Sequence, residues 1–227
     1  MFSTSPLSDR LGVEISSIDL SAPPPDEVMR KLLQTFHENS VIVVRDQKLD
    51  LMKFQHFGTY FGWAKPHFLD HLRLPGYDAI LLLSNIHENG RPIGVYEGAA
   101  FWHTDVAYED PPNTGTIVYA LIVPEVGGRT WFANQYAAYD ALPQPMKTMI
   151  DDLKVIHHYG NRADMNEDSR TSAEKLTEEQ KRKVKNVVMP LVRRHPTPDA
   201  RHRMVLPGVL FILSECRIMK RLPYSIN

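Results

Sequence analysis

The sequence predicts a mainly β fold with flanking helices, an α+β chain whose core is a β-sandwich or jelly roll. Short apolar or alternating segments, which are typical of strands, recur along most of the chain. Helical spacing is confined to the N-terminal region, to a stretch after Asn134 and to one charged insertion. No internal repeat or domain boundary interrupts the 227 residues, so we expect a single domain over residues 1–227.

The N-terminal region predicts two strands and two helices. Leu11–Leu20 alternates apolar and polar residues, as a half-buried strand does, whereas Val41–Val44 is continuously apolar and predicts a buried strand. Glu27–Glu38 and Asp50–Phe61 have apolar residues at helical spacing, and Asp50 is a suitable N-cap for the second helix.

The rest of the chain alternates strands with loops. Further strands are expected at 78–84, 115–123, 130–133, 153–159 and 187–194. A polar loop over 88–98 leads to the region around His103, and Asn134 is expected to cap a helix that Pro143 and Pro145 kink or split. Residues 161–186 are highly charged, with helical character over 172–185, and read as a surface excursion or lid.

Composition excludes several classes of protein. The formal net charge is −1, which gives no bulk attraction to nucleic acid or to an anionic membrane. A single cysteine, Cys216, excludes an intrachain disulfide and a cysteine-rich zinc site. Residues 1–6 do not read as a signal peptide, and no apolar run approaches the roughly 18 residues of a membrane span. A soluble cytoplasmic protein is therefore expected.

The segment Phe101-Trp102-His103-Thr104-Asp105 contains the pattern that the rest of the interpretation depends on. On an extended segment His103 and Asp105 would point the same way, so both could bind one metal ion from one side. With a distant second histidine they would form the facial triad of non-haem Fe(II) oxygenases. The alternative is a hydrogen-bonded polar pair without a metal.

Several motifs occur together with this pattern, in the order Trp102-His103-Thr104-Asp105, Pro111-Pro112, Gly127-Gly128-x-Thr130 and Ala133-Asn134-x-Tyr136-Ala137-Ala138-Tyr139-Asp140-Ala141-Leu142. This arrangement resembles the taurine/2-oxoglutarate dioxygenase (TauD/TfdA-like) family from about Leu11 to Pro196. The resemblance implies a double-stranded β-helix, the cupin-like form of the jelly roll.

The resemblance also implies roles for individual residues. His103 and Asp105 would be the first two Fe(II) ligands, and Thr130 would help to hold the carboxylate of the co-substrate 2-oxoglutarate. His67 would lie near the acid group of the substrate, and Trp102 would pack in the core or line the substrate pocket. The implied function is Fe(II)- and 2-oxoglutarate-dependent hydroxylation of a small acidic organic substrate, with release of succinate and CO2.

Two departures from the family pattern concern the substrate. Ala99 stands where taurine-type enzymes have a substrate-contacting asparagine, and Asp70 stands near the position of an expected tyrosine. Taurine itself is therefore not the expected substrate.

A further departure concerns the third iron ligand. The family's second metal histidine and its 2-oxoglutarate arginine lie well beyond Pro196, near the end of a longer chain. The histidines of this chain that remain as candidates are His157, His158, His195 and His202. None matches the family position, so the third ligand is not identified, and the β-helix is expected to lack its last strands.

The C-terminal tail, about residues 199–227, resembles nothing in the family. Shifting the reading frame by one base over the codons of Met204–Lys220 permits Tyr-Gly-Val-Ser-Gly-Ser-Thr-Phe and a further family-like run. We therefore interpret the tail as the product of a one-base frame slip near Pro198–Met204.

Three hypotheses follow. The chain is an Fe(II)/2-oxoglutarate-dependent dioxygenase; or it is an inactive truncated remnant that binds metal weakly or serves in assembly; or a second subunit of a homo-oligomer donates the missing ligands. Formation of succinate that depends on 2-oxoglutarate separates the first from the second, and activity that falls on dilution identifies the third.

Overall fold

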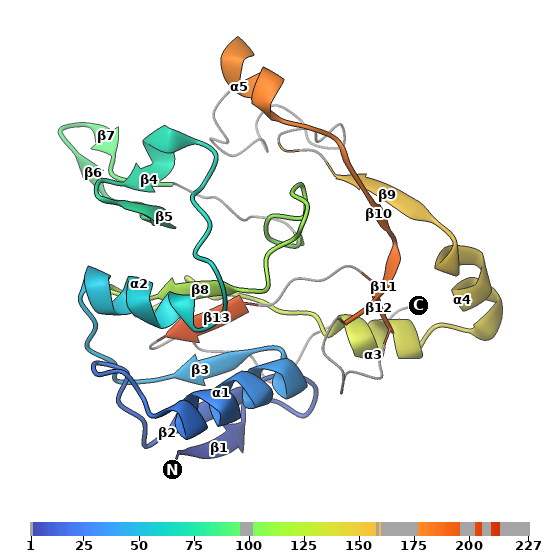
Figure 1. Cartoon of the computed structure of the whole chain (residues 1–227), viewed down its shortest axis with the longest axis horizontal. Helices are drawn as coiled ribbons and strands as arrows, with labels where there is room; N and C mark the ends of the chain where they lie inside the picture. The colour runs from blue at the N-terminus through green and yellow to red at the C-terminus, as the bar shows by residue number, and fades with distance from the viewer. Residues whose placement is uncertain are drawn as a thin grey trace.

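The computed structural model describes residues 2–95, 102–157, 159 and 177–195, and the backbone of 203–205 and 210–213. Figure 1 shows a lower sheet with helices α1 and α2, a group of short strands at the upper left, and an arm of ribbons and helices at the right. In the part of the chain that is described, no helix has the length and hydropathy needed to cross a bilayer.

The largest sheet has five strands in the order β1-β2-β3-β13-β8. Their bounds are β1 (Ser3–Pro6), β2 (Val13–Ser16), β3 (Ile42–Val44), β8 (Thr116–Tyr119) and β13 (Leu210–Leu213). β1 is antiparallel to β2, and each of the other neighbouring pairs is parallel. β2 and β3 are joined through a helix, the usual form of the crossover connection that parallel neighbours need. β1 was not predicted.

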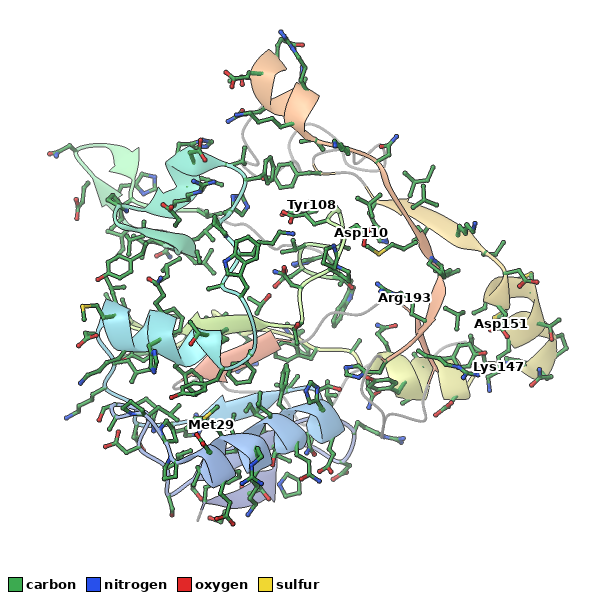
Figure 2. The ribbon with its side chains drawn as sticks, in the orientation of Figure 1. Met29, Tyr108, Asp110, Lys147, Asp151 and Arg193 are labelled. Carbon is green, nitrogen blue, oxygen red and sulfur yellow. The ribbon has the colours of Figure 1, made fainter. Side chains whose placement is uncertain are left out.

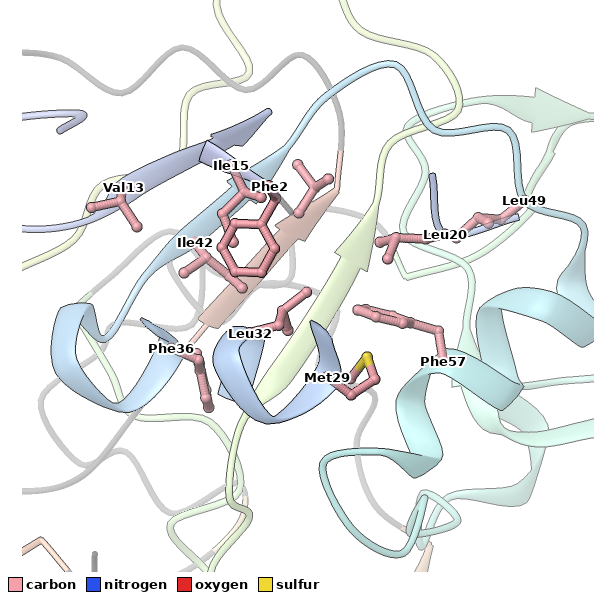
Figure 3. Packing of buried hydrophobic residues seen from close by; sticks show 11 residues of the cluster. Phe2, Val13, Ile15, Leu20, Met29, Leu32, Phe36, Ile42, Leu49 and Phe57 are labelled. Carbon is pink, nitrogen blue, oxygen red and sulfur yellow. The ribbon is translucent and has the colours of Figure 1, made fainter. Parts of the chain in front are cut away.

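The core lies between this sheet and the helices α1 (Asp26–Asn39) and α2 (Leu51–Thr59). Leu32 and Phe36 of α1 and Phe57 of α2 are at most 2% exposed and pack against β2 and β3 (Figure 3). Burying a side chain of this size stabilises the fold by roughly 1.5–3 kcal/mol. The side chain of Asp50 accepts a hydrogen bond from the Lys53 backbone N–H, so both predicted helices and the predicted N-cap are confirmed.

The remaining elements are short. They are η1 (Asp70–Leu72), β4 (Arg73–Leu74), β5 (Tyr77–Leu81), β6 (His87–Glu88), β7 (Arg91–Pro92), α3 (Gln135–Asp140), α4 (Gln144–Asp151), β9 (Lys154–His157), α5 (Glu178–Lys183), β10 (Val187–Pro190), β11 (Val192–Arg194) and β12 (Arg203–Val205). Asn134 caps α3, and the chain splits at Pro143 into two helices, as predicted. The strand predicted over 130–133 is wrong, because this segment is coil with no described strand paired to it.

The predicted α+β class is confirmed. The described strands form one mixed sheet and four two-stranded ribbons rather than two closed sheets. β12 and β13 belong to the segment 199–227 that we interpret as out of frame, and β13 pairs between β3 and β8. The predicted lid falls mostly on residues outside the described ranges; α5 is the part of it that the structure contains.

Candidate metal and co-substrate site

His103 and Asp105 lie together in the loop that precedes β8. Residues 102–104 are coil and 105–108 form a turn, so the extended strand assumed for this segment is wrong. The two side chains nevertheless meet, with His103 Nε2 3.0 Å from Asp105 Oδ1. Val106 follows with φ 55°, a left-handed conformation that a β-branched residue rarely adopts. The bend at Val106 therefore follows directly on the carboxylate that faces His103.

The electrostatics of the pair favour an ionised carboxylate. The hydrogen bond from His103 holds the pKa of Asp105 below its ordinary value; burial acts in the opposite direction, and a hydrogen bond from Thr116 of β8 lowers the pKa further. Two ligand atoms about 2.1 Å from one ion, at a right angle, are about 3 Å apart. The separation of these two atoms and their donor types therefore fit adjacent ligands of one divalent metal.

An aromatic cluster surrounds His67 and extends to the same loop. Tyr159 contacts Phe68 at 4.7 Å, Tyr108 at 5.0 Å and His67 at 6.5 Å between ring centroids. Tyr108 is three residues after Asp105 and is labelled in Figure 2. The Lys65 ammonium and the Glu109 carboxylate form an ion pair in the same region. His67 thus lies beside the loop that carries the metal-binding candidates.

His67 and Tyr108 of this cluster are held neutral. Burial lowers the pKa of His67, and its Nδ1 accepts a hydrogen bond from the Leu69 backbone N–H at 3.1 Å. The ring proton is then on Nε2, which can donate to an anion. Burial raises the pKa of Tyr108, so its hydroxyl remains protonated near neutral pH.

Other predicted site residues are not brought to this loop by any described contact. Thr130 is exposed in coil. Trp102 is 58% exposed, so it does not pack in the core, and the alternative that it lines the substrate pocket stays a prediction. Asp70 forms an ion pair with Arg73 at 2.7 Å. Ala99 and Phe101 lie outside the described residues.

No third metal ligand is found among the described residues, which contain no group of three metal-binding side chains. His157 is on β9, and its Nε2 is buried without a hydrogen-bond partner. The His195 ring contacts those of His37 at 5.5 Å and Tyr136 at 6.4 Å, which is a packing role. His158 and His202 lie outside the described ranges.

Four partly buried histidines predict how stability depends on pH. Burial lowers the pKa values of His37, His67, His157 and His195 below 6.5, so the unfolded chain binds protons first as the pH falls. The free energy of unfolding is therefore highest above pH 6.5 and decreases below it. Thermal unfolding between pH 8 and pH 5 should show a decreasing Tm, with a shallower slope for His37→Gln than for His87→Gln, which replaces an exposed histidine on β6. A flat profile would contradict this.

A histidine and an aspartate that face each other at 3.0 Å supply two of the three ligand types of the facial triad of non-haem Fe(II) oxygenases. Comparison with known proteins makes this specific. The family profile described as "Taurine catabolism dioxygenase TauD, TfdA family" matches residues 3–212. The chain belongs to this family, and the match passes Pro196, where the resemblance seen in the sequence ended.

Comparison with individual proteins agrees with this family assignment. The chain is 27% identical over 201 residues to the alpha-ketoglutarate-dependent 2,4-dichlorophenoxyacetate dioxygenase of Cupriavidus pinatubonensis, covering 84% of this chain and 68% of that protein. It is 28% identical to the alpha-ketoglutarate-dependent sulfonate dioxygenase of Saccharomyces cerevisiae, covering 84% and 45% respectively. The crystal structure of AAD-2 in complex with Mn(II) and N-oxalylglycine has a TM-score of 0.61 at 24% identity, covering 90% of this chain and 68% of that one.

These relatives share the fold with the chain but are longer. The chain spans 45–68% of the length of the curated relatives that it matches. The likeness to the solved structures supports the predicted jelly-roll fold.

Proposed function

We propose that this chain is an Fe(II)- and 2-oxoglutarate-dependent dioxygenase that hydroxylates a small acidic organic substrate and releases succinate and CO2. The observation that carries the proposal is the His103–Asp105 pair, 3.0 Å apart, in a chain of the TauD/TfdA family. The names of the relatives, which are dioxygenases dependent on alpha-ketoglutarate, favour this function over an inactive remnant.

In this proposal each residue of the site has its own role. His103 and Asp105 would hold the metal, and Thr116 keeps the Asp105 carboxylate oriented through its hydrogen bond. Bound Fe(II) would supply O2 activation coupled to oxidation of 2-oxoglutarate. The neutral His67 would donate from Nε2 to the acid group of the substrate, and the rings of Phe68, Tyr108 and Tyr159 would exclude water there. Thr130 and Trp102 stay proposals for co-substrate and substrate contact, on family resemblance alone.

We also infer that residues 1–227 are one domain whose β-helix lacks its last strands. Large apolar side chains on the segment after β8 support this inference, because Leu121, Ile122 and Val126 are 71–89% exposed. Surfaces of this kind are covered by another element or by a partner in most folded proteins. Sequencing the coding DNA from the Pro190 codon past the stop tests the proposed frame slip, since one inserted or deleted base should restore the family-like run.

The direct test of function is formation of succinate from 2-oxoglutarate by the purified chain with Fe(II), ascorbate and a panel of sulfonates, sulfate esters and aryloxy acids. We expect succinate to form only when metal and 2-oxoglutarate are both present. Measurement over a hundredfold range of protein concentration separates an active single chain from a homo-oligomer that shares ligands, because only the latter loses specific activity on dilution. Absence of succinate from a well-folded chain would overturn the proposal.

A further inference from the structure

The inner face of the β9–β10 ribbon carries two polar side chains, His157 and Arg193, that neither the His103–Asp105 site nor the packing of the core explains. The register pairs His157 with Val187 and Val155 with Met189, so these four side chains share one face. Met189 is 6% exposed, whereas Ile156 and Val188 on the opposite face are 64% and 57% exposed. The face that carries His157 is therefore the covered one.

Arg193 extends from β11 to this inner face. Its Nη1 donates to Met189 Sδ at 3.3 Å, and this thioether is a weak acceptor. Among the described residues Arg193 has no carboxylate partner, although it is only partly exposed. A guanidinium presents several N–H donors in a planar fork that matches a carboxylate, so most of its hydrogen-bonding capacity is unused here.

His157 presents the second polar group at this face. Its Nε2 is buried and has no hydrogen-bond partner in the described structure. Burial and then the positive charge of Arg193 lower the pKa of His157, so the two side chains lie within electrostatic range of each other. A neutral imidazole and a guanidinium that has no carboxylate partner among the described residues share this face and give it a positive potential.

The His157–Arg193 pair is connected with the loop that carries His103 and Asp105. Tyr159, two residues beyond His157, contacts the ring of Tyr108 in the loop that carries Asp105. In Figure 2 the labelled Arg193 lies on the side of the ribbon that faces Tyr108 and Asp110. Arg193 therefore lies on the side of the ribbon that faces the loop carrying Asp105, and Tyr159 connects the end of β9 to the same loop.

We propose that Arg193 and His157 form an anion site that binds the carboxylate of a small organic acid, with the guanidinium as the charged partner and the imidazole as a second donor. The ligand class rests on the proposed function, which brings two such acids to the chain: 2-oxoglutarate and an acidic substrate. Both offer the same carboxylate chemistry, and the experiment below distinguishes them.

The test is isothermal titration of the metal-free full chain with 2-oxoglutarate, succinate and phenoxyacetate at constant ionic strength. The wild-type chain should bind either the two dicarboxylates or phenoxyacetate, which identifies the source of the carboxylate. Arg193→Gln should weaken that binding at least tenfold, His157→Gln a few-fold, and Arg193→Lys less than Arg193→Gln.

Arg194→Gln is the matched control, because Arg194 is the next residue of β11 and is exposed. It should bind as the wild type does. Circular dichroism and Tm confirm that each variant is folded. Equal affinity of Arg193→Gln and wild type, an equal loss in Arg194→Gln, or no binding by the folded wild-type chain would overturn the anion site. Because no metal or turnover is involved, these results are independent of whether succinate forms in the activity assay.

Discussion

Replacing Asp105 with alanine is expected to weaken Mn(II) binding by at least on the order of 100-fold and to abolish 2-oxoglutarate-dependent succinate formation. The carboxylate is the charged member of the donor pair, and its lowered pKa keeps it ionised at the pH of the assay. His103→Ala removes the other donor, 3.0 Å away, and should have an effect of similar size. Titration calorimetry or the Mn(II) resonance signal measures the affinity directly.

The control for this prediction is Asp110→Ala, which removes an exposed carboxylate from the same loop and should leave Mn(II) affinity unchanged. Thr116→Val provides an intermediate case: loss of its hydrogen bond to Asp105 should weaken binding by about 10-fold, because residues that orient a ligand contribute less than the ligand itself. Equal affinities for wild type and Asp105→Ala would remove the basis of the metal site.

Local patterns in the sequence were sufficient to predict the helices and the contact between His103 and Asp105. Asp50 and Asn134 are caps whose function depends on backbone groups three residues away, and both cap as predicted. The His-x-Asp spacing likewise brings the two donors together even though the segment is a coil and turn, because only one residue separates them.

The parts that sequence reasoning missed depend on contacts between distant segments. Thr116 reaches Asp105 only because the loop returns to the start of β8, and no residue near Thr116 in the sequence indicates this contact. The link between Arg193 and His157 requires β9 to pair with β10, which brings His157 to the face where Arg193 contacts Met189. The left-handed Val106 carries no glycine or asparagine signal, so a turn at that position could not be read from residue type.

The same limit applies to the tail, where the sequence predicted material foreign to the fold and the structure contains β13. Phe211 pairs with Ile42 of β3 and with Ile117 of β8, so β13 has a parallel partner on both sides. A strand flanked on both sides uses backbone groups along both of its edges. Such a position tolerates proline poorly, because proline lacks the N–H and fixes φ.

Replacing Ile212 with proline is therefore expected to lower the free energy of unfolding by about 3 kcal/mol or more, since a ladder bond between central strands is lost and its acceptor is left unpaired. For a chain of this size the Tm should fall by roughly 6–12 °C. Ile212→Val, which retains the backbone N–H, is the control and should change the Tm little. Thermal unfolding followed by circular dichroism measures both variants.

The outcome decides how the tail relates to the folded unit. A strongly destabilised Ile212→Pro means that the backbone of β13 completes the sheet between β3 and β8, whatever reading frame encodes it, because strand pairing uses main-chain groups that every residue except proline supplies. An unchanged Tm means that β3 and β8 are stable without it, and residues 199–227 are then an appendage. In that case the apolar surface beside β8 should promote self-association, which light scattering would detect as a mass above that of one chain.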